Sequence, residues 1–156
     1  MFEEECSGAG IIIYYDNRDG NIKNKKKDIL YLFLVTGNNL DFPKGHKDHG
    51  EYPFDCATRE TKEECGLSLD IDYSCNENLF KQFNKGLVMY LGKKNDHELL
   101  KNIEILPNTS VNPPIKEHDY PLWLSKKECL DKSNKNKIYD FLVEPLNWAE
   151  ETIKQF

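Results

Sequence analysis

The sequence has no surplus of basic residues and no long hydrophobic run. Its 21 lysines and arginines are outnumbered by 27 aspartates and glutamates, and the net charge of −6 argues against a general nucleic-acid or membrane-surface binder. The apolar runs at 11–15 and 29–35 are too short to cross a bilayer. The first ten residues are acidic and lack the features of a signal peptide, so we expect a cytoplasmic protein.

Cysteines at metal-binding or redox spacing are also missing. The five cysteines form no C-x-x-C motif, and their odd number is typical of free thiols in a reducing compartment. Arginine is scarce, because Arg18 and Arg59 are the only two in the chain. With 156 residues and no linker or repeat, the chain is expected to form a single domain over residues 1–156.

Hydrophobic patterning predicts many strands and two main helices. Strands are predicted at 8–15, 29–35, 67–74, 78–83, 86–92, 103–106 and 120–124. A helix is predicted at 52–65, where Pro53 suits the first turn and Gly66 suits the position after the end. An amphipathic helix is predicted over 136–156, with Phe141 on its apolar face and a kink at Pro145. These elements indicate an α+β or α/β/α-sandwich domain.

The helix predicted at 52–65 carries three clustered acids. Glu60, Glu63 and Glu64 are spaced i, i+3 and i+4, so they project toward a common side. One interpretation is a solvated helix face with Arg–Glu pairs. However, the preceding loop contains Gly45 and Gly50, which allow a backbone to approach a ligand closely. Mg²⁺ prefers carboxylate oxygens and bridges to phosphates, so the residues predict metal-assisted hydrolysis of a phosphoanhydride.

Residues 45–67 match the pattern G-x5-E-x7-R-E-U-x-E-E-x-G-U, where U is a bulky aliphatic residue, except for Thr61 at the first U position. This stretch resembles the Nudix box. The resemblance implies an α+β fold, a Nudix-type α/β/α sandwich with a mixed sheet, a catalytic helix and a C-terminal helix. It implies ligands for Mg²⁺, with Mn²⁺ as a substitute, at the Gly45 carbonyl, Glu60, Glu63 and Glu64. Glu51 and Arg59 resemble the structural pair that orients the loop against the helix.

The segments flanking the box resemble one Nudix subgroup. "FPKGH" at 42–46 and "KEHDYPLWL" at 116–124 are similar to the asymmetrical diadenosine tetraphosphate hydrolases. This likeness implies cleavage of diadenosine tetraphosphate to ATP and AMP by attack of a metal-activated water. The expected partner is therefore a small dinucleoside polyphosphate, bound by a monomer. His49 stands where the subgroup usually has a proline, and Leu40 and Phe42 also depart from its pattern.

The same likeness assigns roles to further residues. The catalytic candidates are Glu60, Glu64 and Glu117, with Glu60 and Glu117 both open as the general base. The candidates for polyphosphate binding are Lys44, His46 and Lys85, and those for stacking on adenine are Phe80, Phe83 and Tyr90. For Phe80 and Phe83 a place in the core is an equally good interpretation.

Two alternatives keep the fold and change the function. Other Nudix enzymes act on diphosphoinositol polyphosphates, capped RNA, ADP-ribose or nucleoside triphosphates. A catalytically silent nucleotide-binding module is the last alternative, because such proteins commonly lose a glutamate of the box and this chain retains all of them.

Overall fold

A computed structural model describes residues 5–156; the first four residues of the acidic N-terminus lie outside this range. The strands are β1 (Gly8–Asp16), β2 (Ile29–Thr36), β3 (Asn39–Asp41), β4 (Lys44–His46), β5 (Tyr73–Gln82), β6 (Leu87–Lys94), β7 (Pro107–Asn108), β8 (Ile115–Lys116), β9 (Tyr120–Ser125) and β10 (Lys137–Ile138). The helices are α1 (Pro53–Cys65), α2 (Lys126–Leu130) and α3 (Val143–Ile153), with 3₁₀ turns η1 (Asn84–Gly86) and η2 (Asp140–Leu142). No helix in the described range is long and apolar enough to span a membrane.

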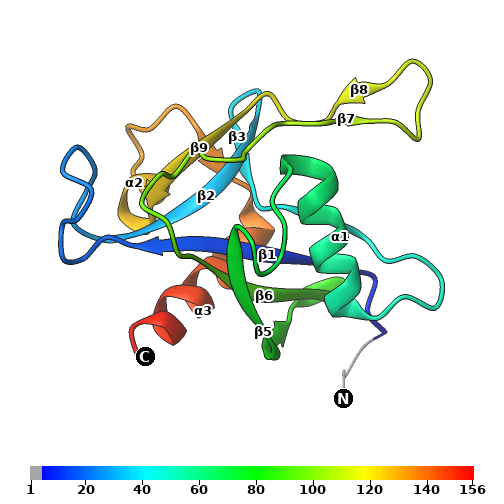
Figure 1. Cartoon of the computed structure of the whole chain (residues 1–156), viewed down its shortest axis with the longest axis horizontal. Helices are drawn as coiled ribbons and strands as arrows, with labels where there is room; N and C mark the ends of the chain where they lie inside the picture. The colour runs from blue at the N-terminus through cyan, green and yellow to red at the C-terminus, as the bar shows by residue number, and fades with distance from the viewer. Residues whose placement is uncertain (1–4) are drawn as a thin grey trace.

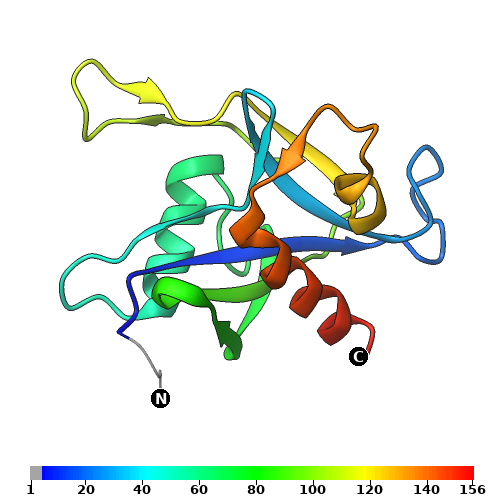
Figure 2. The same cartoon turned by 180° about the vertical axis from the view of Figure 1, so that it is seen from behind.

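A mixed sheet forms the middle layer of the molecule, and α1 and α3 lie on its two sides (Figures 1 and 2). Its strand order is β10-β3-β2-β1-β6-β5, and β4 and β9 add to β1 and β2. β1 and β6 run parallel, whereas β1 and β2 run antiparallel. The expected α+β sandwich with a mixed sheet, a helix after the loop and a C-terminal helix is confirmed.

The two faces of β1 supply two separate apolar cores. Ile11 and Ile13 pack with the buried face of α1, whereas Ile12 and Tyr14 pack with α3 on the opposite side. Successive side chains of a strand point to opposite faces, so a continuous apolar run is expected where both faces are covered. This explains why the run at 11–15 does not alternate with polar residues.

β1 changes its partner along its length, and this change positions the loop before α1. Its second half pairs with β2, but its first three residues, 8–10, pair with the short strand β4. The short strand β4 also contacts α1. Lys44, Gly45 and His46 are therefore held in an extended row between the central strand and the helix.

The ends and the interior of α1 follow from local chemistry. Pro53 occupies the first turn, where its missing N–H is not needed, and Gly66 adopts a left-handed conformation with φ of 80° just after the helix. Thr61 stands where the Nudix pattern has an aliphatic residue. It is fully buried, and its hydroxyl donates to the Ala57 carbonyl at 2.8 Å, which satisfies the polar group.

Two predicted strands were wrong. The segment 67–72 forms a turn in which Asp70 has φ of 66°, and the strand begins only at Tyr73. The segment 103–106 is not in the sheet, because its N–H groups donate to carbonyls at the C-terminal end of α1. Glu104 N–H donates to the Cys65 carbonyl, and Leu106 N–H donates to the Glu64 carbonyl.

The prediction of one C-terminal helix over 136–156 was also wrong. Residues 137–138 pair with β3 as β10, and α3 begins at Val143. Pro145 therefore lies in the first turn of α3 and does not kink a longer helix. Phe141, predicted on the buried face, is 56% exposed, because it lies in η2 outside α3.

Candidate active site

β4 and α1 approach each other so closely at position 45 that only glycine, which has no side chain, fits there. A Cβ atom built on Gly45 would lie 2.2 Å from the carboxylate of Glu60. The Glu60 carboxylate is thus pressed against the backbone of the loop, and the Lys44 N–H donates to Glu64 Oε1 at 2.9 Å. Glycine is required here for close approach.

Arg59 joins the loop to the acidic face of α1. Its Nε and Nη2 donate to the two carboxylate oxygens of Glu51 at 2.8 and 3.0 Å, and Nη2 also donates to the His46 carbonyl. Its Nη1 lies 2.8 Å from Glu60 and 3.1 Å from Glu63. Bidentate contact fixes the orientation of the guanidinium, so Arg59 holds the loop and both helix carboxylates in one arrangement.

A second group forms near the C-terminal end of α1. Ligand atoms of Glu64, Glu117 and His118 all lie within 4.8 Å of one another and could hold a metal ion. His118 Nε2 lies 3.4 Å from Glu64 Oε2, and His118 Nδ1 lies 2.8 Å from Thr36 Oγ1. Asn108 donates to the Glu117 carboxylate at 2.7 Å. The predicted ligands Gly45, Glu60 and Glu63 are outside this group of three, although Arg59 and β4 keep Glu60 and Glu63 on the same helix face.

The acids of the site carry shifted pKa values. Burial raises the pKa of Glu60 to about 6, against the opposing effect of Arg59 and with a further contribution from Glu64. Burial also raises the pKa of Glu64, although contacts with His118 and the Lys44 N–H lower it in part. A divalent cation would offset the cost of holding these buried carboxylates ionised.

An exposed aromatic pair lies beside Lys44. The Lys44 ammonium is 3.2 Å from Asp41 Oδ1 and 5.3 Å from the centre of the Phe141 ring. Phe141 stacks on Tyr139 with ring centres 5.7 Å apart. The Lys44 backbone N–H contacts Glu64, so Lys44 links the aromatic pair to one carboxylate of α1.

The structure places the predicted adenine-stacking residues differently from the sequence hypothesis. Phe83 is 6% exposed and packs edge-to-face on Trp148, and Tyr90 is buried between Phe54 and Phe80. A ring covered by protein side chains has no free face for a base, so stacking by Phe83 and Tyr90 does not agree with this structure. Phe80 is partly buried in the core on the α1 side.

His46 and Lys85, which the sequence also assigns to polyphosphate binding, are both exposed. His46 is exposed and its carbonyl accepts from Arg59, whereas the carbonyl of Lys85 accepts from the Ser7 hydroxyl. Sequence reasoning missed His118, Thr36, Asp41 and the Tyr139–Phe141 pair as parts of the site. The signal for His118 was its place next to Glu117 in "KEH", but nothing in the sequence indicated that its ring faces Glu64.

A family model described as "NUDIX domain" matches residues 11–141, which is most of the chain. The chain belongs to the Nudix family. Two curated proteins of Caenorhabditis elegans are similar in sequence. The m7GpppN-mRNA hydrolase dcap-2 is 44% identical over 67 residues, 42% of this chain and 8% of that protein. An asymmetrical bis(5'-nucleosyl)-tetraphosphatase is 32% identical over 94 residues, 56% of this chain and 64% of that protein.

Each match therefore spans less than two thirds of the curated Nudix relative. Solved structures agree over nearly the whole chain. A C. elegans Ap4A hydrolase in a binary complex has a TM-score of 0.66 at 20% identity, covering 96% of this chain and 99% of that one. The Nudix hydrolase RenU from M. smegmatis has a TM-score of 0.62 at 11% identity, covering 99% and 89%. These likenesses show the Nudix fold.

Proposed function

We propose that this Nudix hydrolase cleaves diadenosine tetraphosphate asymmetrically, to ATP and AMP, with Mg²⁺ as its cofactor. The observation that carries the proposal is the convergence of Glu64, Glu117 and His118 beside the acidic face of α1. The similarity to the C. elegans asymmetrical bis(5'-nucleosyl)-tetraphosphatase adds support for the substrate. We infer that the chain acts as a cytoplasmic monomer with one domain.

The residues present fit a divalent cation, because carboxylate oxygens dominate and one imidazole nitrogen adjoins them. We assign the ion-binding groups to Glu64 and Glu117, and further ligands to the Gly45 carbonyl, Glu60 and Glu63. When bound, the ion would supply Lewis-acid polarisation of the phosphate oxygens. Mn²⁺ is expected to substitute, since it accepts the same ligands.

The other groups bind and orient the substrate. Lys44, fixed by Asp41, presents a positive charge beside the carboxylates, where a polyphosphate would need neutralisation. The exposed Phe141 ring, supported by Tyr139, offers a flat surface for one adenine. Phe141 therefore takes the role that the sequence assigned to Phe83 and Tyr90.

Glu60 and Glu117 remain the two candidates for the proton acceptor, and their settings differ. Glu60 is held by Arg59 against Gly45 and has a pKa near 6, which suits proton transfer near neutral pH. Glu117 is exposed and held by Asn108. Glu60→Gln and Glu117→Gln should both raise the Mg²⁺ concentration needed for half-maximal rate, because both residues are assigned as ligands. The change at the proton acceptor should cause the larger fall in kcat at saturating Mg²⁺.

The test is chromatography of the products formed from diadenosine tetraphosphate with Mg²⁺. Equal amounts of ATP and AMP support the proposal, whereas two ADP molecules or no turnover overturn it. Glu64→Gln should abolish turnover because it removes an ion-binding oxygen, and the matched change Glu77→Gln on the exposed part of β5 should not. An unchanged rate in Glu64→Gln would refute the ligand assignment.

Capped RNA is the second candidate substrate, favoured by the 44% identity to the mRNA hydrolase over 67 residues. It ranks lower because the chain has a net charge of −6, whereas RNA binding gains most of its affinity from basic surface. Release of a methylated guanosine diphosphate from capped RNA at a rate above that of diadenosine tetraphosphate cleavage would reverse this order.

A further inference from the structure

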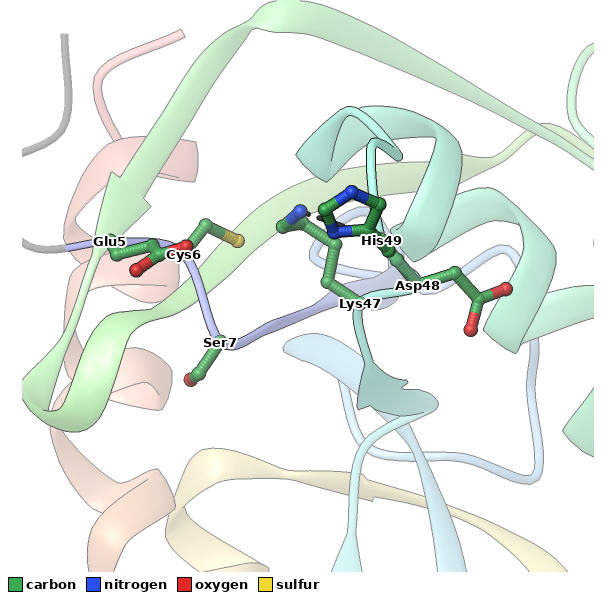
Figure 3. Close-up of a pocket in the computed structure, with 6 residues that line it drawn as sticks. All are labelled: Glu5, Cys6, Ser7, Lys47, Asp48 and His49. Carbon is green, nitrogen blue, oxygen red and sulfur yellow. Dashed lines mark hydrogen bonds between the residues drawn. The ribbon is translucent and has the colours of Figure 1, made fainter.

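A pocket opens between the segment that precedes β1 and the segment that follows β4. It has a volume of about 440 Å³ and is lined by Glu5, Cys6, Ser7, Lys47, Asp48 and His49 (Figure 3). Figure 3 shows the side chains of Lys47 and His49 close together on one side and Cys6 on the other. Of these lining residues, Asp48 contacts the Glu51–Arg59 pair, and the other five have no role assigned above.

Three segments distant in sequence are fastened together around this pocket. The backbone of Ser7 donates to the Gly86 carbonyl at 3.0 Å and accepts from the Lys47 N–H at 3.1 Å. The Ser7 hydroxyl donates to the Lys85 carbonyl. A Cβ on Gly86 would lie 2.3 Å from the Glu5 carbonyl, so glycine is required for the N-terminal segment to lie there. These contacts fix the positions of the segments that line the pocket.

The pocket follows β4 directly along the chain, and β4 contacts the acidic face of α1. The contacts of β4 follow α1 residue by residue: Lys44 with Glu64, Gly45 with Glu60, and the His46 carbonyl with Arg59. Lys47 is the next residue and enters the pocket, about 10 Å along an extended chain from Lys44.

The extended segment 44–47 therefore has a different surface at each end. The Phe141 ring lies by Lys44 at one end, and the pocket lies by Lys47 at the other, with the carboxylates of α1 between them. A substrate with a charged chain in the middle and a nucleoside at each end matches this order of surfaces.

The chemistry of the lining suits a nucleoside linked to phosphate. His49 is exposed and offers an aromatic imidazole face, which can stack on a base. Glu5 and Asp48 offer carboxylates that can accept hydrogen bonds from ribose hydroxyls. The Lys47 ammonium donates to the neighbouring Asp48 carbonyl at 3.3 Å and supplies a positive charge for a phosphate.

We propose that this pocket binds the second nucleoside of a dinucleoside polyphosphate, with His49 stacking on its base. The inference rests on the proposed function, since it divides one substrate between two ends of the same site. It makes His49, which replaces the proline expected of the subgroup, a determinant of specificity for substrates with two nucleosides.

The experiment compares two substrates that share a tetraphosphate chain. Diadenosine tetraphosphate carries a nucleoside at both ends, and adenosine 5'-tetraphosphate carries one. We would measure kcat/KM for both substrates with the wild type, His49→Ala and His49→Phe. The ratio is kcat/KM for diadenosine tetraphosphate divided by kcat/KM for adenosine 5'-tetraphosphate. His97→Ala is the matched control, because His97 is an exposed histidine in the loop after β6. Thermal unfolding midpoints of all variants would verify folding.

Loss of the ring should lower the ratio about tenfold in His49→Ala, through a higher KM for the two-nucleoside substrate. His49→Phe should restore the ratio, because a flat ring is retained, and His97→Ala should match the wild type. An unchanged ratio in His49→Ala overturns the pocket assignment and leaves the proposed function standing. Failure of the wild type to release ATP and AMP from diadenosine tetraphosphate overturns both.

Discussion

His118 and Glu64 lie 54 positions apart in the sequence, and the ring Nε2 of His118 is 3.4 Å from Glu64 Oε2. Both side chains are largely buried. The other ring nitrogen of His118 contacts the Thr36 hydroxyl at the end of β2, and that hydroxyl donates to the Glu117 carbonyl. One histidine thus joins the catalytic helix, the central sheet and the segment that carries Glu117.

Removing this ring should weaken metal binding more than folding. In His118→Ala the buried Glu64 carboxylate loses a partner, and the Thr36 hydroxyl, which donates to the Glu117 carbonyl, loses its contact with the imidazole. We expect the Mg²⁺ concentration for half-maximal rate to rise about 10- to 100-fold. The measurement is a Mg²⁺ titration of initial rates at saturating substrate, with His97→Ala as the control. A variant with the wild-type Mg²⁺ dependence would show that His118 only packs.

The Glu51–Arg59 pair should stabilise the folded chain. The Arg59 hydrogen bonds hold the pKa of Glu51 at about 2, well below its ordinary 4.5. Because solvent screens an ion pair near the surface, Glu51→Gln should lower the free energy of unfolding by about 1–2 kcal/mol, measured by urea denaturation. Asp48→Asn is the control, because Asp48 is 72% exposed and 3.6 Å from Arg59, and its loss should cost less than about 1 kcal/mol. Equal effects of the two changes would contradict the prediction.

The box could be recognised from the sequence because its spacing is local. Pro53 and Gly66 mark the ends of α1, and the i, i+3, i+4 spacing puts the three acids on one side. The sequence also predicted that Gly45 allows a close backbone approach to a ligand, and the structure shows that the group next to it is the Glu60 carboxylate. These features depend on residues within one loop and one helix.

The parts that sequence reasoning missed depend on long-range packing. Whether an aromatic side chain is buried depends on which element covers it, and nothing near Phe83 or Phe141 indicated that Trp148 covers the first and leaves the second open. The segment 103–106 has the composition of a strand, but its N–H groups are taken by the open carbonyls of α1. Local propensity cannot reveal such competition for backbone partners.

Phe141 and Phe83 should give opposite phenotypes. Phe141→Ala removes an exposed ring beside Lys44, so KM for diadenosine tetraphosphate should rise about tenfold with little change in stability. Phe83→Ala removes a buried ring, so the free energy of unfolding should fall by about 3–5 kcal/mol with KM nearly unchanged. Steady-state kinetics and urea denaturation of both variants provide the measurement. A raised KM in Phe83→Ala alone would return the stacking role to Phe83.

Stability without metal should depend on pH in a defined direction. Burial raises the pKa of Glu60 to about 6, so between pH 6 and 4.5 the folded chain binds more protons than the unfolded chain. The free energy of unfolding in a chelator should therefore increase by about 1 kcal/mol as the pH falls from 7.5 to 5. Below about pH 4.5 the Glu51 contribution is lost as its carboxylate is protonated, and stability should fall again.

Mg²⁺ should oppose the loss of stability that the chelated protein shows as the pH rises above 6. Ions bind the ionised carboxylates of the folded chain, so saturating Mg²⁺ should stabilise the protein at pH 7.5 and have little effect at pH 5, where Glu60 is protonated. Thermal unfolding at both pH values, with Mg²⁺ and with a chelator, gives the four midpoints required. In Glu60→Gln the preference of the chelated protein for pH 5 should become weaker, because one of the groups that take up protons is gone. The same Mg²⁺ stabilisation at pH 5 as at pH 7.5 would show that Glu60 is not ionised on metal binding.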